Sequence, residues 1–292
     1  MLHLTKLNYK HSAVVYLLSM ATSLVISVVL TLTQGSKPLD DVLFWVINGA
    51  YSICLGGVAL LSLAIDKQPL VQGLGLNKKI SIKQVVLLLS TVFVLINLSV
   101  VVNNWLIDLL NSWGATLSDG SESMQIVLRN PVVAILVACL LPAINEELVF
   151  RGVFVRGLHY KFGTVVSVVF SAFAFAVFHG SVSQTLHQFL LGCLLSWVAL
   201  STDSVVLPMM AHFFNNVAVV LLGIFVEPTG VYDKWGWLVV VICLALLVPL
   251  VALCCKQFKV KLPTGKQALG NGWLIAIFGT FALSMFLWIG SL

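Results

Sequence analysis

The feature that most constrains this chain is a succession of nine long apolar stretches separated by polar ones. They lie near residues 13–33, 42–65, 84–107, 131–157, 164–180, 186–202, 204–225, 236–255 and 271–290. An apolar stretch of about 20 residues can cross the hydrocarbon core of a bilayer as a helix. Only 9% of the residues are charged, whereas a soluble domain has about 25%. The sequence therefore predicts an all-α, polytopic integral membrane bundle of eight to nine helices.

The charges in the loops predict the orientation of the chain. With the N-terminus in the cytosol, 13 of the 16 Lys and Arg residues lie on the cytosolic side, and only Lys37, Arg129 and Lys234 lie outside. Cytosolic loops are enriched in Lys and Arg, so we expect an N-in orientation. The net charge of +5 is scattered over several loops. It therefore indicates topology, and we expect no nucleic-acid partner.

Polar linkers divide the chain into three parts. Residues 1–123 hold three N-terminal helices, residues 124–226 form a central block, and residues 227–292 hold the last two helices. Ionisable side chains inside apolar helices are costly and usually functional. Ionisable side chains within the spans are concentrated in the central block, at Glu146, Glu147, Arg151, His179 and His212, where Asn215 and Asn216 also lie. The flanking spans contain mainly Asn48, Asn97, Asn103 and Asn104. We therefore expect chemistry or transport in this block.

The spacing of these groups predicts which of them meet. Glu147 and Arg151 are four residues apart, so their side chains share one helix face and can form an ion pair. Glu146 points about 100° away from Glu147 and is free to face another helix. Counted at about 1.5 Å per residue from the predicted turns, Glu146, His179 and His212 are expected to converge inside the membrane.

Other polar residues near these positions are given structural roles. His159 and His187 are expected at the edges of loops, and Asn215 is expected to be a packing or hydrogen-bonding residue. Pro142 lies one turn before Glu146. Because proline removes a backbone hydrogen bond, we expect the helix to bend there.

A carboxylate and two imidazoles around one cavity are suited to activating water. A buried Glu can serve as a general base, and His and Asn donors can stabilise a tetrahedral oxyanion. Two His and a carboxylate with an open fourth position are also a catalytic zinc pattern, here His179, His212 and Glu146. The H-E-x-x-H signature of common zinc peptidases is absent from the chain. Whether the site uses a divalent metal such as zinc is therefore left open.

Three motifs in successive apolar helices resemble those of the CPBP family. These are intramembrane proteases related to the CAAX prenyl endopeptidase, also called the Abi family. The motifs are E-E-x-x-x-R at residues 146–151, F-x-x-x-H at residues 175–179 and H-x-x-x-N at residues 212–216. The resemblance covers about residues 124–226. It implies an endopeptidase that hydrolyses a peptide bond in a membrane-associated or lipidated protein or peptide.

The resemblance also implies roles for the matching residues. Glu146 would activate the water, and His179 would help to hold it. His212 and Asn216 would form the oxyanion site. The pair that supports this geometry would be Glu147 and Arg151. The resemblance favours a glutamate mechanism without a metal.

Two other functions stay open at this stage. Intramembrane Glu, Arg and His side chains also mark proton or ion pathways in transporters, here Glu146, Arg151 and His179. The chain lacks the paired repeats that transporters often show. A family member that no longer cleaves could instead act as an immunity or maturation factor. The expected partners are the lipid bilayer and a peptide or protein substrate in or at the membrane. A compact helical chain of this kind is typical of the bacterial cytoplasmic membrane.

Overall fold

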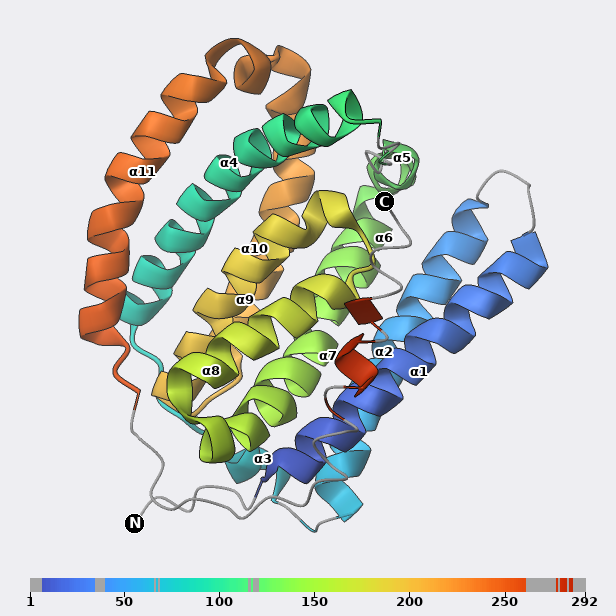
Figure 1. Cartoon of the computed structure of the whole chain (residues 1–292), viewed down its shortest axis with the longest axis vertical. Coiled ribbons are helices and arrows are strands. Elements are labelled where there is room, and N and C mark those ends of the chain that lie inside the picture. The colour runs from blue at the N-terminus through green and yellow to red at the C-terminus, as the bar shows by residue number, and fades with distance from the viewer. Residues whose placement is uncertain are drawn as a thin grey trace.

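The described part of the chain is a bundle of long, tilted helices (Figure 1). The computed structural model describes residues 7–34, 40–65, 67, 69–114, 117, 121–260, 277, 279–282, 284 and 285. Within these residues the regular structure is helical and no strand occurs. Seven helical segments are long and apolar enough to cross a membrane. The prediction of a polytopic, all-α membrane protein is therefore confirmed.

Long helices alternate with short helical segments along the chain. The long helices are α1 (Tyr9–Gln34), α2 (Asp41–Ile65), α4 (Ile82–Ser112), α8 (Val155–Phe178), α9 (Val182–Thr202), α10 (Val206–Phe225) and α11 (Val231–Gln257). The short segments are α3 (Leu70–Gly73), α5 (Ser121–Arg129), α6 (Pro131–Ala134), α7 (Leu141–Glu147), the π-helical η1 (Ile135–Leu140) and η2 (Leu148–Phe154), and the 3-10 turn η3 (Glu227–Thr229).

The longest apolar segment is a helical hairpin. Pro131–Phe178 is one of the seven membrane-crossing segments, but Gly163 within it has φ 75° and ψ 178°. Glycine reaches this region of backbone conformation at little cost. Phe154 before the turn and Phe170 after it have ring centroids 6.2 Å apart. The chain therefore reverses at Gly163, and the two spans predicted on either side of it are separate limbs.

The hairpin explains why seven segments correspond to eight of the nine predicted spans. Its two limbs match the predicted spans 131–157 and 164–180, and the other six segments match one span each. The predicted span 271–290 lies largely outside the described residues. Within the part of the chain that the structure describes, seven segments are therefore long enough to cross a membrane, and one of them contains two of the predicted spans.

Small residues bring the second limb of the hairpin close to α9. A Cβ atom added at Gly192 would lie 3.0 Å from the Cα atom of Ala172. Such close approach through Gly and Ala is how membrane helices gain packing contacts, since lipid is as apolar as their side chains. Outside this pair, α4 packs against α11, and α1 packs against α2. These two pairs flank the hairpin on opposite sides (Figure 1).

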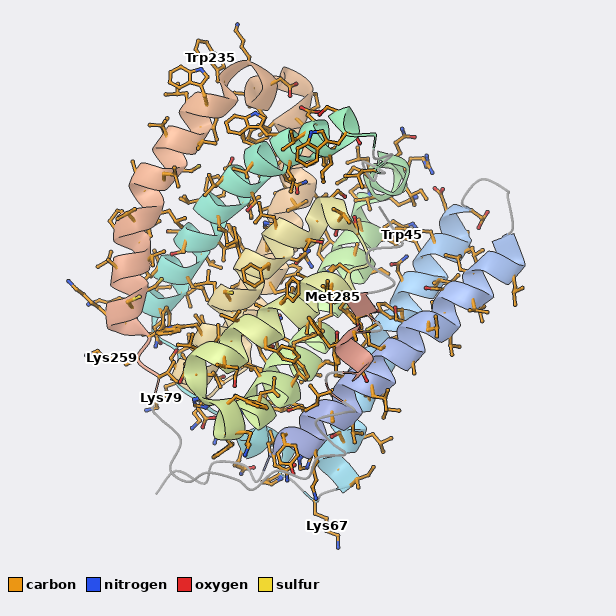
Figure 2. The ribbon with its side chains drawn as sticks, viewed as in Figure 1. Trp45, Lys67, Lys79, Trp235, Lys259 and Met285 are labelled. Carbon is orange, nitrogen blue, oxygen red and sulfur yellow. The ribbon has the colours of Figure 1, made fainter. Side chains whose placement is uncertain are left out.

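The two ends of the bundle differ in charge. Lys67, Lys79 and Lys259 lie toward one end, and Trp235 lies at the other (Figure 2). We call the end with the three lysines the basic end. An N-in orientation requires this grouping, because it places the Lys-rich loops together in the cytosol. The orientation itself stays a prediction from charge.

Candidate active site

Three helical elements bring the predicted residues to one cavity. Glu146 lies on α7, His179 follows the last residue of α8, and His212 and Asn216 lie one turn apart on α10. All four line a cavity of about 670 Å³. This volume falls within the range of about 300–1,000 Å³ that is usual for ligand sites. The convergence expected from helix lengths is therefore present in the structure.

The Glu146 carboxylate lies between two imidazoles. Its Oε2 atom is 3.9 Å from Nε2 of His179 and 3.9 Å from Nε2 of His212. Both distances exceed a direct hydrogen bond, and Oε2 has no hydrogen-bond partner among the described residues. The side chain of Glu146 is only 11% exposed. Polar atoms at this separation can be joined by one bridging water molecule.

Fixed acceptors orient both imidazole rings. Nδ1 of His179 is 2.8 Å from the carbonyl oxygen of Phe175, and a carbonyl oxygen only accepts, so Nδ1 donates. Nδ1 of His212 is 2.8 Å from Oε1 of Glu147 and donates to this carboxylate in the same way. In the neutral form of each ring, Nε2 then keeps its lone pair on the side of Glu146.

The carboxylate that accepts the hydrogen bond from His212 belongs to a buried ion pair. Nη1 of Arg151 donates to Oε1 of Glu147 at 2.7 Å, as the spacing of four residues predicts. Nη2 of Arg151 donates to the carbonyl oxygen of Gly192 at 3.3 Å. The guanidinium carbon lies 4.3 Å from the centroid of the Phe175 ring, which is a favourable cation–π distance. Arg151 therefore ties the first limb of the hairpin to both α8 and α9.

The structure adds to the site His187 and Asn215, to which the sequence analysis gave only structural roles. Nε2 of His187 lies 3.0 Å from Oδ1 of Asn215, and Nδ2 of Asn215 donates to Oδ1 of Asn216 at 3.1 Å. Nδ2 of Asn216 keeps only a long contact of 3.5 Å with the carbonyl oxygen of Cys139. His187 and Asn215 line the same cavity as Asn216. Through this chain of contacts they set the direction of the Asn216 amide.

The prediction that His187 lies at a loop edge is wrong. It lies within α9, five residues after the helix begins at Val182, because the chain turns earlier than expected. The position of Asn215 beside Asn216 was a visible signal, but the sequence does not show which helix faces it. His159 does lie beside a turn, where its Nε2 atom is 3.0 Å from the hydroxyl of Thr164.

Pro142 occupies a helix that widens on both sides of it. η1 ends at Leu140 and η2 begins at Leu148, and the backbone stays helical throughout α7 between them. η1 contains Ala138, whose carbonyl oxygen would have accepted the hydrogen bond that Pro142 cannot donate. The bend at Pro142 stays a prediction. π-helical segments such as η1 and η2 are frequent at functional sites.

The side chains around Glu146 are spaced more widely than the ligands of a bound zinc ion. Among the described residues, no three His, Cys, Asp or Glu side chains form a group that could hold a metal ion. Ligand atoms of tetrahedral zinc, bonded at about 2.0–2.1 Å, are about 3.4 Å apart, whereas the separations from Glu146 are 3.9 Å. A metal ion held by all three of these side chains would require them to approach one another by about 0.5 Å.

Comparisons with known proteins agree with the motifs. The family model of Rce1-like proteins, described as type II CAAX prenyl endopeptidases, matches residues 128–218. This stretch lies within the predicted central block 124–226 and contains every residue assigned above to the site. No curated protein and no solved structure matches the chain. Residues 128–218 of this membrane-spanning chain therefore carry an Rce1-like domain, the domain of type II CAAX prenyl endopeptidases, which supports the resemblance to the CAAX protease (CPBP) family.

Proposed function

We propose that this protein is an intramembrane endopeptidase in which Glu146 activates the hydrolytic water. One observation carries the choice of base: Oε2 of Glu146 lies 3.9 Å from Nε2 of both His179 and His212, at the inner end of the cavity. A water molecule bound among these three atoms can donate a proton to the carboxylate. The family match supports peptide-bond hydrolysis over transport and over a non-cleaving role.

The reaction proceeds through a tetrahedral intermediate. Nε2 of His179 accepts a hydrogen bond from the water, and Glu146 takes the other proton as the water oxygen bonds to the carbonyl carbon. The carbonyl oxygen becomes an oxyanion, which accepts hydrogen bonds from Nδ2 of Asn216 and from His212 when its Nε2 carries a proton. Glu146 then returns its proton to the amide nitrogen. The carbon–nitrogen bond breaks and releases a carboxyl and an amino product.

The substrate in this proposal is a protein or peptide in or at the membrane. The printed family description points to the C-terminal segments of prenylated proteins, and the resemblance found in the sequence includes peptides such as bacteriocins. The protein would act in the bacterial cytoplasmic membrane. The proposal assigns no metal to the reaction, and the chelator in the assay below tests that choice.

A cleavage assay tests the proposal. Purified protein in detergent is incubated with a quenched peptide library, with and without a strong chelator, beside Glu146→Gln and the control variant His159→Gln. We expect cleavage to survive chelation, to persist in His159→Gln, and to fall about 10²–10⁴-fold in Glu146→Gln, the usual contribution of a general base. Full activity in Glu146→Gln would overturn the role of Glu146. Loss with chelator and recovery with zinc would overturn the metal-free mechanism.

A further inference from the structure

The cavity extends from Glu146 toward the end of the bundle opposite the basic end. α1, α4 and α10 run away from the basic end, and they line the cavity with residues from their middle and later turns, within 23–30, 96–103 and 212–220. α2 and α9 run toward the basic end, and they line it with residues from their earlier turns, within 47–52 and 183–188. The site is therefore reached from the half of the bundle that carries Trp235 (Figure 2).

The path from the site to the basic end is closed by packed side chains. Leu74, Phe150, Phe154 and Val205 belong to one apolar cluster, and each is at most 2% exposed. The fully buried Arg151 lies next to this cluster. None of these five residues lines the cavity.

The loops at the basic end are bonded to each other beneath this cluster. The amide of Val205 donates to the carbonyl oxygen of Leu74 at 3.1 Å, and the hydroxyl of Ser204 donates to that of Gly75 at 2.7 Å. Lys78 forms an ion pair with Asp203 at 3.1 Å. These contacts join the loop after α3 to the turn between α9 and α10. None of the described residues that make these contacts lines the cavity that contains Glu146.

The turn between α8 and α9 meets the cavity through His179 and is expected to lie within the membrane. The second limb of the hairpin, residues 164–178, extends only about 22 Å, which is shorter than the hydrocarbon core of about 30 Å. The turn accordingly lies below the far ends of α4 and α11 (Figure 1). Gly180 in this turn is exposed, with φ +62° and open space around it. Exposed irregular backbone at membrane depth is tolerated where it lines a water-filled cavity.

We infer that the site opens to the extracytoplasmic side, and that its substrate is a membrane-inserted or exported polypeptide approached from that side. The side follows from the N-in orientation, which puts the basic end in the cytosol. The scissile bond of such a substrate lies in the outer half of the bilayer, where the cavity leads to Glu146. A lipidated C-terminus in the cytosol would face the closed end. The identity of the substrate class rests on the proposed peptidase function, whereas the direction of access does not.

Cysteine labelling tests the direction of access without relying on cleavage. The full chain is first freed of its own thiols at Cys54, Cys139, Cys193, Cys243, Cys254 and Cys255. Single cysteines are then placed in the cavity wall (Asn103→Cys or Val220→Cys), at the basic end (Lys79→Cys) and at the far end (Trp235→Cys). A charged maleimide that does not cross membranes is added to intact cells and to permeabilised cells.

We expect both cavity cysteines and Trp235→Cys to be labelled in intact cells, and Lys79→Cys only after permeabilisation. Cavity cysteines that react only after permeabilisation would overturn the inference, because the cavity would then open to the cytosol. Cavity cysteines that react in neither condition would also overturn it, because the cavity would then be closed to water. Two cavity positions on different helices guard against a variant that misfolds.

Oriented proteoliposomes separate this inference from the proposed function. A quenched peptide is added outside vesicles whose protein has either the far end or the basic end outward, as scored by labelling of Trp235→Cys and Lys79→Cys. Cleavage confined to vesicles with the far end outward is expected. Cleavage confined to the opposite orientation would keep the peptidase function and overturn the direction of access. Extracytoplasmic labelling without cleavage of any peptide would count against the peptidase function alone.

Discussion

Nη1 of Arg151 lies 2.7 Å from Oε1 of Glu147, and neither side chain has any exposed surface. The same oxygen accepts the hydrogen bond from Nδ1 of His212 at 2.8 Å. One carboxylate atom therefore holds the helix together and orients an imidazole of the site. Removing Glu147 must act on stability and on activity at once.

A double-mutant cycle on this pair should reveal strong coupling. Glu147→Gln and Arg151→Met each leave one buried charge without its partner, which costs about 3–5 kcal/mol of unfolding free energy. The double variant removes both charges, so we expect it to lose clearly less than the sum of the two single variants. The measurement is the thermal unfolding midpoint of each protein in detergent. Losses that simply add would show that the pair does not act as a unit.

Arg151→Lys should be only a partial rescue. Lysine keeps the positive charge beside Glu147 but cannot also bond the carbonyl oxygen of Gly192 or stack on Phe175 as the planar guanidinium does. We expect a loss of about 1.5–3 kcal/mol, the contribution of a hydrogen bond to a charged group. Thermal unfolding midpoints of the parent, Arg151→Lys and Arg151→Met test whether stability decreases in that order. A lysine variant as stable as the parent would mean that charge alone is required.

His179 and His159 offer a matched pair of histidine substitutions. His179→Gln removes an Nε2 acceptor on the side of Glu146, and we expect kcat to fall by at least about 10²-fold, in the range of general acid–base contributions. His159→Gln lies beside the turn at Gly163 and should leave kcat within about twofold. Cleavage rates of both variants at equal amounts of folded protein decide the matter. Equal losses in the two variants would indicate a fault in folding and not in chemistry.

The contacts from His187 to Asn216 predict a graded series of effects. Asn216→Ala removes a donor to the oxyanion, which costs about 10²–10³-fold in kcat at comparable sites. Asn215→Leu keeps the Asn216 donor but removes the hydrogen bond that orients it. The Asn216 side-chain amide can then rotate, so we expect a smaller loss in kcat and little change in KM. Steady-state kinetics on the two variants give the comparison. An Asn215→Leu enzyme with normal kcat would show that Asn216 holds its orientation by itself.

Substitutions at two glycines that have space for a Cβ atom distinguish the effect of backbone strain from the effect of packing. Gly163→Ala forces a Cβ onto a residue at φ 75°, and we expect a cost of about 1–3 kcal/mol. Gly57 in α2 also has no atom within 4 Å of an added Cβ and shows no positive φ, so Gly57→Ala should be neutral or stabilising by about 0.5–1 kcal/mol. Unfolding midpoints of both variants test the hairpin turn. A tolerant Gly163→Ala would mean that the turn does not depend on glycine.

Ionisable residues in apolar helices made most of the site predictable from the sequence. Glu146, His179 and His212 are conspicuous because such groups are rare and costly in a membrane. His187 was missed because a histidine near a predicted turn has an ordinary explanation. Its role depends on α9 beginning at Val182 and facing α10. Which faces of two helices meet is set by packing, and hydropathy alone carries no information on it.

The topology was predictable to a similar depth. Apolar length identified the crossing helices, and the turn at Gly163 fell between two predicted spans. The π-helical segments around α7 left no trace in composition, since their residues are as apolar as those of any membrane helix. The direction in which the cavity opens was equally invisible, because it depends on the short second limb of the hairpin and on side chains that close the basic end.

The two π-helical segments have a consequence for how this site could change over evolutionary time. One residue inserted into or deleted from a helix turns all following side chains by about 100° relative to those before it. η1 and η2 take up such an offset on either side of α7. The direction in which the Glu146 and Glu147 side chains point can thus change independently of the directions of the side chains at both helix ends. A single-residue insertion or deletion could re-aim Glu146 while the loops, the packing at each end and the depth of the helix in the bilayer stay as they are.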